Sequence, residues 1–299
     1  MAITSVGYAG SITDNNWRRM ATAAVGSTYG VDDFASWRPT IGTGDRATQL
    51  ADGGIFGLGV RDVSDAPISL THAPAVSGSR WDLIVAHRNW STKTTTPQII
   101  QGSSVKALPD RDTGFGATND QPIALVRITA GQSAVQEIID LRCIPGDAGL
   151  VAFDLLTRSY LDRVGTTVRI GNYEWTRTVD SLGSPMWTHL DVTPDTGWVE
   201  ITRNSGWNFT FGQARRIGAL ITVRISAGRT QGWSANGELA IIPPQFRPDT
   251  NWYVNSSANT GKTEFMFTPG GQVVASQNSG GATGVTLSTT YPAPGPVTT

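Results

Sequence analysis

Residues 238–254, ELAIIPPQFRPDTNWYV, decide the fold class of this 299-residue chain. The run ELAII is typical of a strand, and Pro243 and Pro244 end it because proline cannot donate to a β ladder. We expect Phe246 to plug the base of a β-sandwich. Arg247, held extended before Pro248, is expected to make the hydrogen bond or ion pair that fixes the entry of the next strand. The stretch therefore predicts a corner between two antiparallel strands.

Short strand runs separated by turn residues also occur on both sides of this corner. Between 196 and 292, about eight short runs of strand formers are separated by Gly- and Pro-rich turns, which predicts a jelly-roll-like antiparallel sandwich. Residues 26–145 alternate strand runs with Gly, Pro, Ser and Asp in the same way. One amphipathic helix is expected at 13–25, where Trp17 and Met20 share a face and Thr13 or Asp14 can cap the first turn. The chain is therefore predicted to be mainly β.

Two segments suggest how the halves are joined. In TTVRIGNYEWTRTV, 166–179, two strand runs flank Gly171-Asn172, which predicts a hairpin with a primed two-residue turn. At 145–165 an apolar stripe at helical spacing predicts a connector helix. That stripe could be a seam between chains or could lie on its own domain; it consists of Leu150, Phe153, Leu156, Tyr160 and Val164. The predicted divisions are 1–145, 146–165 for the connector, and 166–299 for a β-hairpin neck and a head.

Composition excludes several classes of protein. Charged residues make up 16% of the chain, against about 25% in ordinary globular proteins. The net charge of −1 supplies no basic field for nucleic acid. No apolar run approaches the ~20 residues that cross a bilayer, so no membrane insertion is expected. The first residues lack a signal-peptide pattern, so we expect synthesis in the cytoplasm.

No motif predicts a metal or a cofactor. The three histidines, His72, His87 and His189, lack the spacing of a zinc site. Asp110, Asp112 and Asp120 lie in a loop that departs from the EF-hand pattern and is better explained by turns. The single cysteine, Cys143, stands in an apolar segment and is expected to be a buried small hydrophobe.

A hydrolase would need two carboxylates at a suitable separation. Asp191, Asp195 and Glu200 cluster in the sequence, and Glu174 lies in the predicted hairpin. Nothing in their pattern distinguishes them from solvated turn carboxylates. The sequence therefore predicts that the protein is not an enzyme.

Several stretches resemble a known family. RRIGALITVRISAG, GELAIIPPQFRPD, EFMFTPGGQVVAS and the closing TLSTTYPAP are similar to the C-terminal heads of phage tail receptor-binding proteins. SGSRWDLIVAHRNW, QPIALVRITAG and IIDLR resemble the baseplate-proximal half of minor tail or upper-baseplate proteins of phages infecting Gram-positive, often actinobacterial, hosts. The corner departs from the family pattern at Pro244-Gln245, where a small residue and Gly are usual, so a variant turn is expected.

The resemblance implies a homotrimer with β-sandwich heads in the virion, at the tail tip or baseplate. Residues 1–145 would then dock on other tail or baseplate proteins, and the head would bind host cell-wall carbohydrate for adhesion. The alternatives are a tail-associated polysaccharide-degrading enzyme and a purely structural minor tail protein.

Tryptophan supplies the candidate binding residues, because an indole can stack on the C–H face of a sugar and donate from its edge. Trp233 lies in the Gly-rich loop GRTQGWSANG, where it is expected to be exposed. Trp252 and Tyr253 begin the strand run that follows the proline corner. The sequence NSS, residues 255–257, comes shortly after them. The predicted ligand-binding residues are Trp233, Trp252, Tyr253, Asn236 and Asn255.

Overall fold

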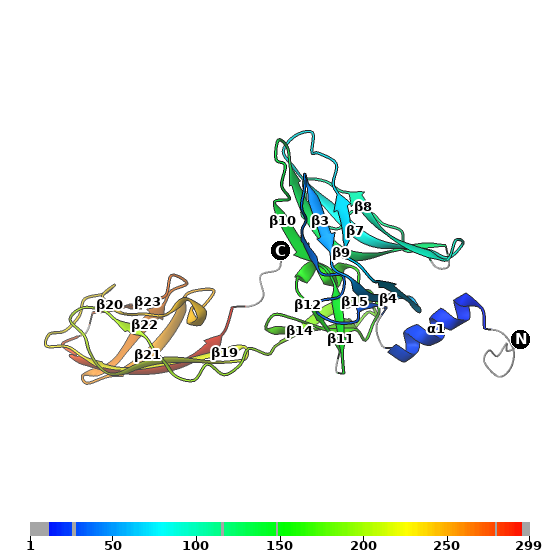
Figure 1. The fold of residues 1–299 in the computed structure, drawn as a ribbon. Helices are drawn as coiled ribbons and strands as arrows, with labels where there is room; N and C mark the ends of the chain where they lie inside the picture. The colour runs from blue at the N-terminus through cyan, green and yellow to red at the C-terminus, as the bar shows by residue number, and fades with distance from the viewer. Residues whose placement is uncertain (1–11, 26–27, 115–116, 148, 279, 295–299) are drawn as a thin grey trace, which may run out of the picture. The chain divides into compact units, whose positions relative to one another are not determined.

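The computed structural model describes residues 12–25, 28–114, 117–147, 149–278 and 280–294. The fold is mainly β, as predicted. The chain forms two compact units, Met1–Leu190 and Asp191–Thr299, both drawn in Figure 1. The boundary between the units falls later than the predicted one at residue 165. No helix in the described ranges has the length and apolar character needed to cross a membrane.

The described residues of the first unit form one α-helix, one 3-10 helix and four small sheets. Helix α1 begins as predicted, with the Asn16 amide donating to Thr13 Oγ1 at 3.3 Å. The elements are α1 Asp14–Val25, β1 Tyr29–Val31, β2 Pro39–Ile41, β3 Ala47–Leu50, β4 Gly53–Gly57, β5 Val60–Ser64, β6 Ile68–Thr71, β7 Ser79–Asn89, β8 Thr94–Gln101, β9 Thr118–Thr129, β10 Glu137–Asp140, β11 Cys143–Gly146, β12 Gly149–Ala152, η1 Leu155–Ser159, β13 Thr167–Ile170, β14 Tyr173–Val179 and β15 Pro185–Asp191.

Strands β7 and β9 form the centre of this unit, in a sheet of order β10-β9-β7-β8 (Figure 1). Successive residues of β7 enter different cores: Leu83 packs with one cluster that includes Trp175, and Ile84 packs with another that includes Trp37. A strand covered on both faces needs apolar residues at every position, not at alternate ones. This explains the continuous apolar run in RWDLIVAHRNW.

The predicted hairpin forms, but it belongs to the first unit. Strands β13 and β14 pair with Ile170 opposite Tyr173, and Gly171 takes a φ of 58°, as the first position of a primed turn requires. Val168 and Trp175 are buried in the core of this unit. The hairpin is therefore part of a sheet of order β11-β12-β13-β14-β15 and not the neck of the head.

The prediction of a connector α-helix at 146–165 is wrong. The segment contains strand β12 and the short 3-10 helix η1. Leu150 and Tyr160 are buried in the core of the first unit, and the Tyr160 hydroxyl bonds the main-chain carbonyl of Leu141. Strand β12 can pair in parallel with β13, and this pairing outweighs the local helical spacing. The apolar stripe thus lies mainly on its own unit.

In the second unit, the part that the structure describes contains nine strands and one 3-10 turn. They are β16 Val199–Glu200, β17 Thr202–Arg203, β18 Asn208–Ile217, β19 Leu220–Gly228, β20 Glu238–Ile241, η2 Pro244–Phe246, β21 Trp252–Ala258, β22 Gly261–Phe267, β23 Gln272–Ala275 and β24 Gly284–Pro292. The sheet order is β16-β18-β19-β24-β21-β22-β23-β20-β17.

One short segment nearly closes this sheet. Val199 in β16 pairs with Ala214 in β18, and three residues later Thr202 in β17 pairs with Ile241 in β20. Between them, the Ile201 amide donates to the Gly212 carbonyl at 2.9 Å. The two strands at the ends of the sheet, β16 and β17, are therefore separated by one residue of the chain. Because each is paired with its neighbour, little strand edge is left free.

The proline corner is confirmed. Phe246 is fully buried in the core of the second unit, at the end of the variant turn η2. Arg247 is extended, with φ −80° and ψ 143°, and its Nε donates to the Ile242 carbonyl at 3.1 Å. The corner thus carries the chain from β20 into β21 and contributes a core residue.

Candidate ligand-binding face

The prediction that Trp233 is exposed is wrong. Its side chain is 4% exposed, and its ring lies 5.2 Å from that of Trp207 and 5.9 Å from that of Phe265. The Gly-rich loop folds over the end of the sandwich, and the large indole fills the space beneath it. Loop composition indicates flexibility of the backbone but does not show which apolar surface lies within reach. Trp233 is therefore a core residue.

Trp252 and Tyr253 cannot contact the same ligand. Adjacent residues of a strand point to opposite faces. Trp252 packs near Tyr291, with ring centroids 6.0 Å apart, and donates from Nε1 to Thr289 Oγ1 at 3.0 Å. Tyr253 is 56% exposed on the other face, with exposed Asn255 two positions along.

Asn236 occupies a turn in the left-handed region, with φ 63°, and its amide donates to the Ala275 carbonyl at 2.8 Å. No described contact joins it to Tyr253 or Asn255. The five predicted residues therefore do not form one site: two lie inside the sandwich, two share the outer face of β21, and one lies in a turn.

A second exposed aromatic residue lies on a more extensive polar surface. The outward side chains of β16, β18, β19 and β24 form rows across the sheet, because Glu200 pairs with Gln213, Gln213 with Arg224, and Arg224 with Ser288. The residues between them along each strand are buried or half-buried. We call this surface the Trp198 face; it comprises Trp198, Glu200, Phe211, Gln213, Arg215, Thr222, Arg224, Ser226, Thr286, Ser288 and Thr290.

Trp198 is held in place by a guanidinium group. The Arg224 Cζ lies 3.9 Å from the centre of the indole ring, a stacked cation–π contact. Both Nε and Nη2 of Arg224 donate to Gln213 Oε1, at 3.1 and 2.7 Å, and Gln213 in turn donates to Glu200. Trp198 is 38% exposed, so part of the residue remains accessible beside Arg224.

A second arginine borders the same indole. Arg215 lies 5.9 Å from the ring of Trp198 and donates to Asp195 from Nε at 2.9 Å. The hydrogen bond from Arg215 lowers the pKa of Asp195 to about 2. Asp195 therefore stays ionised at neutral pH and keeps Arg215 beside Trp198.

Two of the carboxylates considered for hydrolysis, Asp191 and Asp195, are held by arginine partners. Burial raises the pKa of Asp191, but hydrogen bonds from Thr193 and Arg216 outweigh it and leave that pKa below its ordinary value. A glycosidase needs a carboxylic acid that keeps its proton near neutral pH. Neither Asp191 nor Asp195 fits that role.

The first unit also brings titratable groups together. Ligand atoms of His87, Asp112 and Asp120 lie within 4.8 Å of one another, whereas Asp110 is not part of the cluster. His87 Nδ1 lies 2.7 Å from Asp120 Oδ1, the Asp112 amide donates to Asp120 Oδ2 at 2.8 Å, and Thr118 donates to Asp112 at 2.8 Å. Hydrogen bonds within the protein account for this cluster, and we assign no metal to it.

Cys143 is 1% exposed, as predicted. Burial raises the pKa of its thiol to about 12, and its Sγ lies 3.1 Å from the Tyr160 hydroxyl. A thiol of this kind is unreactive at neutral pH.

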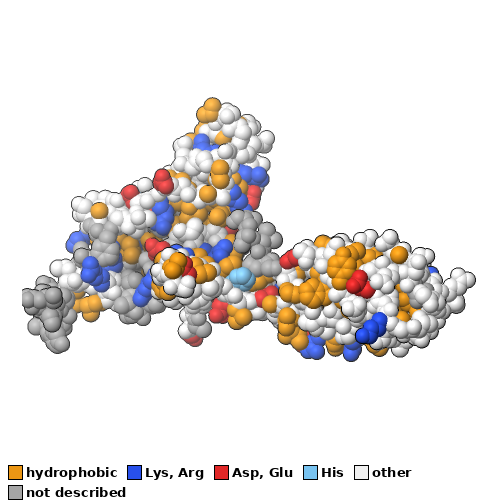
Figure 2. All heavy atoms as spheres, turned by 180° about the vertical axis from the view of Figure 1, so that it is seen from behind, with side chains coloured by type: hydrophobic (Ala, Val, Ile, Leu, Met, Phe, Trp, Pro, Cys, Tyr) orange, Lys and Arg blue, Asp and Glu red, His pale blue; other side chains and the backbone are white. Residues whose placement is uncertain are grey.

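The Trp198 face brings aromatic and hydrogen-bonding side chains together on the described surface of the second unit. Figure 2 shows that hydrophobic side chains on one side of this unit lie beside acidic and basic ones. Sequence reasoning could have found the face from the alternation in β18 and β19, but not its pairing with β16.

The sequence matches no family model and no curated protein. Fold and face together define a mainly β protein with a pre-ordered polar and aromatic surface.

Proposed function

We propose that this chain is a non-catalytic carbohydrate-binding protein that attaches a phage tail to the surface of its host. The Asp191–Thr299 unit carries the ligand, and the Met1–Leu190 unit docks on other tail or baseplate proteins. The observation that carries the proposal is the indole of Trp198, which stacks on Arg224 and is still 38% exposed. The phage context rests on the resemblance of the sequence alone.

The chemistry of the face suits an uncharged sugar. A pyranose ring has C–H faces that pack on an indole, and hydroxyl groups around its rim that both donate and accept. Glu200 and Gln213 supply acceptors and donors beside Trp198, and Thr222 and Thr290 supply hydroxyls that bond each other at 3.0 Å. Because these side chains are already bonded to one another, little side-chain entropy is lost on binding.

We also propose that the protein is a homotrimer. The apolar stripe of the predicted connector, considered as a seam between chains, packs mainly on the first unit, where Leu150 and Tyr160 are buried. Another surface therefore joins the chains in the proposed trimer. The hairpin of β14 and β15 exposes apolar side chains, with Leu182 at its tip 89% exposed. The exposed apolar residues of this hairpin and its end are Val179, Leu182, Met186 and Leu190.

The test compares two exposed aromatics of the same unit. Full-length protein is applied to a panel of immobilised bacterial wall polysaccharides, and binding is measured by surface plasmon resonance. Trp198→Ala is expected to weaken binding at least about tenfold with an unchanged melting temperature, and Tyr253→Ala to bind like the wild type. Equal binding by Trp198→Ala and the wild type would overturn the assignment to this face. Release of new reducing ends from the polysaccharide would overturn the non-catalytic proposal.

A further inference from the structure

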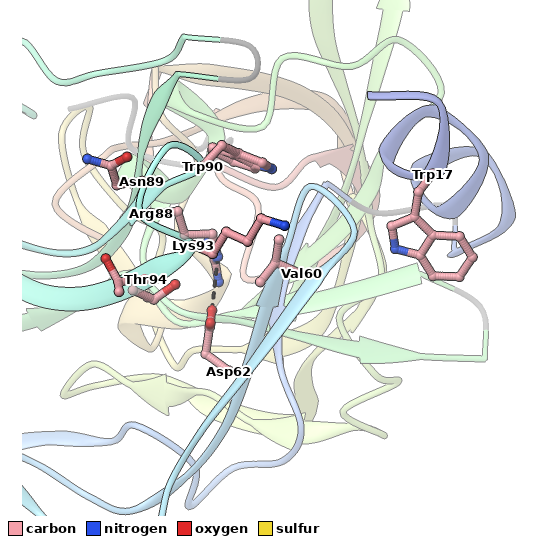
Figure 3. Close-up of a pocket in the computed structure, with 9 residues that line it drawn as sticks. Trp17, Val60, Asp62, Arg88, Asn89, Trp90, Lys93 and Thr94 are labelled. Atoms are coloured by element: carbon pink, nitrogen blue, oxygen red, sulfur yellow. Dashed lines mark hydrogen bonds and ion pairs between the residues drawn. The ribbon is translucent and has the colours of Figure 1, made fainter. Parts of the chain in front are cut away.

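A hollow of about 210 Å³ lies in the first unit, and none of its lining residues belongs to the Trp198 face. Helix α1, strands β5, β7 and β8, and the loop between β7 and β8 contribute to it (Figure 3). Its lining residues are Trp17, Val60, Asp62, Arg88, Asn89, Trp90, Lys93, Thr94 and Thr95. Aromatic, cationic and hydroxyl side chains thus meet in one place.

Arg88 is the buried charged group of this hollow. Its side chain is 1% exposed, with Nε donating to Asp62 Oδ2 at 3.0 Å and Nη1 donating to Gln121 Oε1 at 2.7 Å. Its Nη2 has no hydrogen-bond partner in the part of the chain that the structure describes. A buried donor without an acceptor costs about 1–3 kcal/mol, and more for a charged group. A ligand acceptor would remove that cost.

The balance of charge in the hollow favours an anion. Arg88 and Lys93 contribute two positive charges, and Asp62 contributes one negative charge, which Arg88 already binds (Figure 3). The ammonium group of Lys93 forms no ion pair among the described residues. The hollow therefore has one positive charge in excess.

The loop that carries Lys93 is held in a defined conformation. Asn89 Oδ1 accepts from the amides of Ser91 and Thr92, at 2.9 and 3.2 Å. Lys93 itself has a φ of 55°, in the left-handed region that few non-glycine residues occupy. The fixed turn directs the residue that supplies the excess charge to the wall of the hollow.

Two indoles and Val60 provide the apolar part of the wall. Trp17 on α1 is exposed. Its indole nevertheless has a fixed orientation, because Nε1 donates to the Gly59 carbonyl at 2.9 Å. Trp90 is half-buried at the start of the loop, where its amide donates to the Ala117 carbonyl at 3.0 Å. Flat apolar rings beside two cations, Arg88 and Lys93, suit a ligand that combines a C–H-rich ring with an anionic group.

We propose that this hollow binds an acidic sugar, a pyranose that bears a carboxylate. The carboxylate accepts from the free Nη2 of Arg88 and from Lys93, the sugar ring packs on Trp90 and Trp17, and its hydroxyls meet Thr94 and Thr95. A carboxylate fits better than a phosphate dianion, because the excess charge of the hollow is one. This site is independent of the Trp198 face, and its failure would leave the proposed function unchanged.

The test uses ligand-observed NMR titration of full-length protein with sodium D-glucuronate, D-glucose and inorganic phosphate. Glucuronate is expected to bind at least about tenfold more tightly than glucose, which carries a hydroxymethyl group in place of the carboxylate. Lys93→Gln should weaken glucuronate binding about fivefold or more, and Lys106→Gln, an exposed lysine of the same unit outside the hollow, should not. Asp62→Asn should tighten it, because the excess charge rises to two, and a gain of affinity cannot come from unfolding.

Four results would overturn the proposal. They are equal affinity for glucuronate and glucose, phosphate binding as tight as glucuronate binding, equal effects of Lys93→Gln and Lys106→Gln, and no binding of glucuronate by the folded wild type. Melting temperatures of each variant establish that the comparison is made on folded protein.

Discussion

The phenolic hydroxyl of Tyr291 donates a hydrogen bond of 2.7 Å to the main-chain carbonyl of Phe246. This bond joins the last strand of the second unit to the turn after the proline corner, 45 residues earlier in the chain. Both side chains are buried, and the ring of Tyr291 lies 5.9 Å from that of Phe267. The corner is thus fixed from inside the core and not by its prolines alone.

We expect Tyr291→Phe to lower the free energy of unfolding by about 1–3 kcal/mol, because a buried carbonyl loses its partner. Phe246→Ala should cost about 3–5 kcal/mol, the range for a buried aromatic ring truncated in a core. Urea unfolding measures both. Tyr253→Phe, which removes an exposed hydroxyl, is the matched control and should leave the midpoint unchanged. Polysaccharide binding by the folded fraction should persist in all three variants.

Gly271 supports the same corner from the neighbouring turn. It has a φ of 93°, and a Cβ there would lie 2.7 Å from the Ile242 carbonyl oxygen and 2.5 Å from Arg247 Nε. Gly271→Ala should therefore destabilise the protein by about 1–3 kcal/mol. Gly270→Ala adds the same methyl next door, where nothing lies closer than 3.5 Å. Similar melting temperatures for the two variants would contradict this account.

Trp233 and Trp198 should behave in opposite ways. Trp233→Ala removes a buried ring from between Trp207 and Phe265 and should cost about 3–5 kcal/mol. Trp198→Ala removes a surface ring and should hardly change the melting temperature. Differential scanning calorimetry of both variants checks this pair. A stable Trp233→Ala protein would mean that the Gly-rich loop does not cover the core.

Asp82 should make the stability of the first unit depend on pH. Burial raises its pKa, but hydrogen bonds from His72 and Arg80 outweigh this and hold it below the ordinary value. A carboxyl with a lowered folded-state pKa stabilises the protein above the unfolded pKa, about 3.9. That stability is lost as the pH falls through the folded-state pKa.

Asp82→Asn should therefore lower the melting temperature at pH 7 and reduce the difference in melting temperature between pH 7 and pH 3. Exposed Asp110→Asn should change neither. Thermal unfolding followed by circular dichroism at several pH values measures the effect. If the melting temperature of Asp82→Asn depended on pH as that of the wild type does, other carboxyl groups would account for the pH dependence of stability.

The trimer predicts a particle of three times 31.8 kDa in light scattering at micromolar concentration. If the β14–β15 hairpin joins the chains, Leu182→Glu should shift the mass toward one chain, because burying an unpaired charge at an interface is costly. Val105→Glu replaces another exposed apolar residue of the same unit and should keep the trimer. A wild-type monomer would contradict the assembly and weaken the resemblance on which it rests.

The local features of this fold were predictable because they depend on neighbouring residues. Period-two alternation predicts strands on either side of the corner, Gly171 permits the primed turn, and consecutive prolines end β20. The burial of Phe246 followed from its place in that corner. The apolar spacing at 145–165 was misleading, because the same residues also suit strand β12 and a buried 3-10 turn.

The sequence by itself determined the mainly β class, the hairpin at 166–179 and the proline corner, since each depends on conformational preferences within a few residues. Only the tertiary structure decided which tryptophans are accessible and which charges meet. Trp198 stacks on Arg224 because β16 pairs with β18, and Arg88 of β7 bonds Asp62 of β5, a strand of another sheet. Such contacts depend on pairing between residues far apart in the chain, and local preference does not encode that pairing.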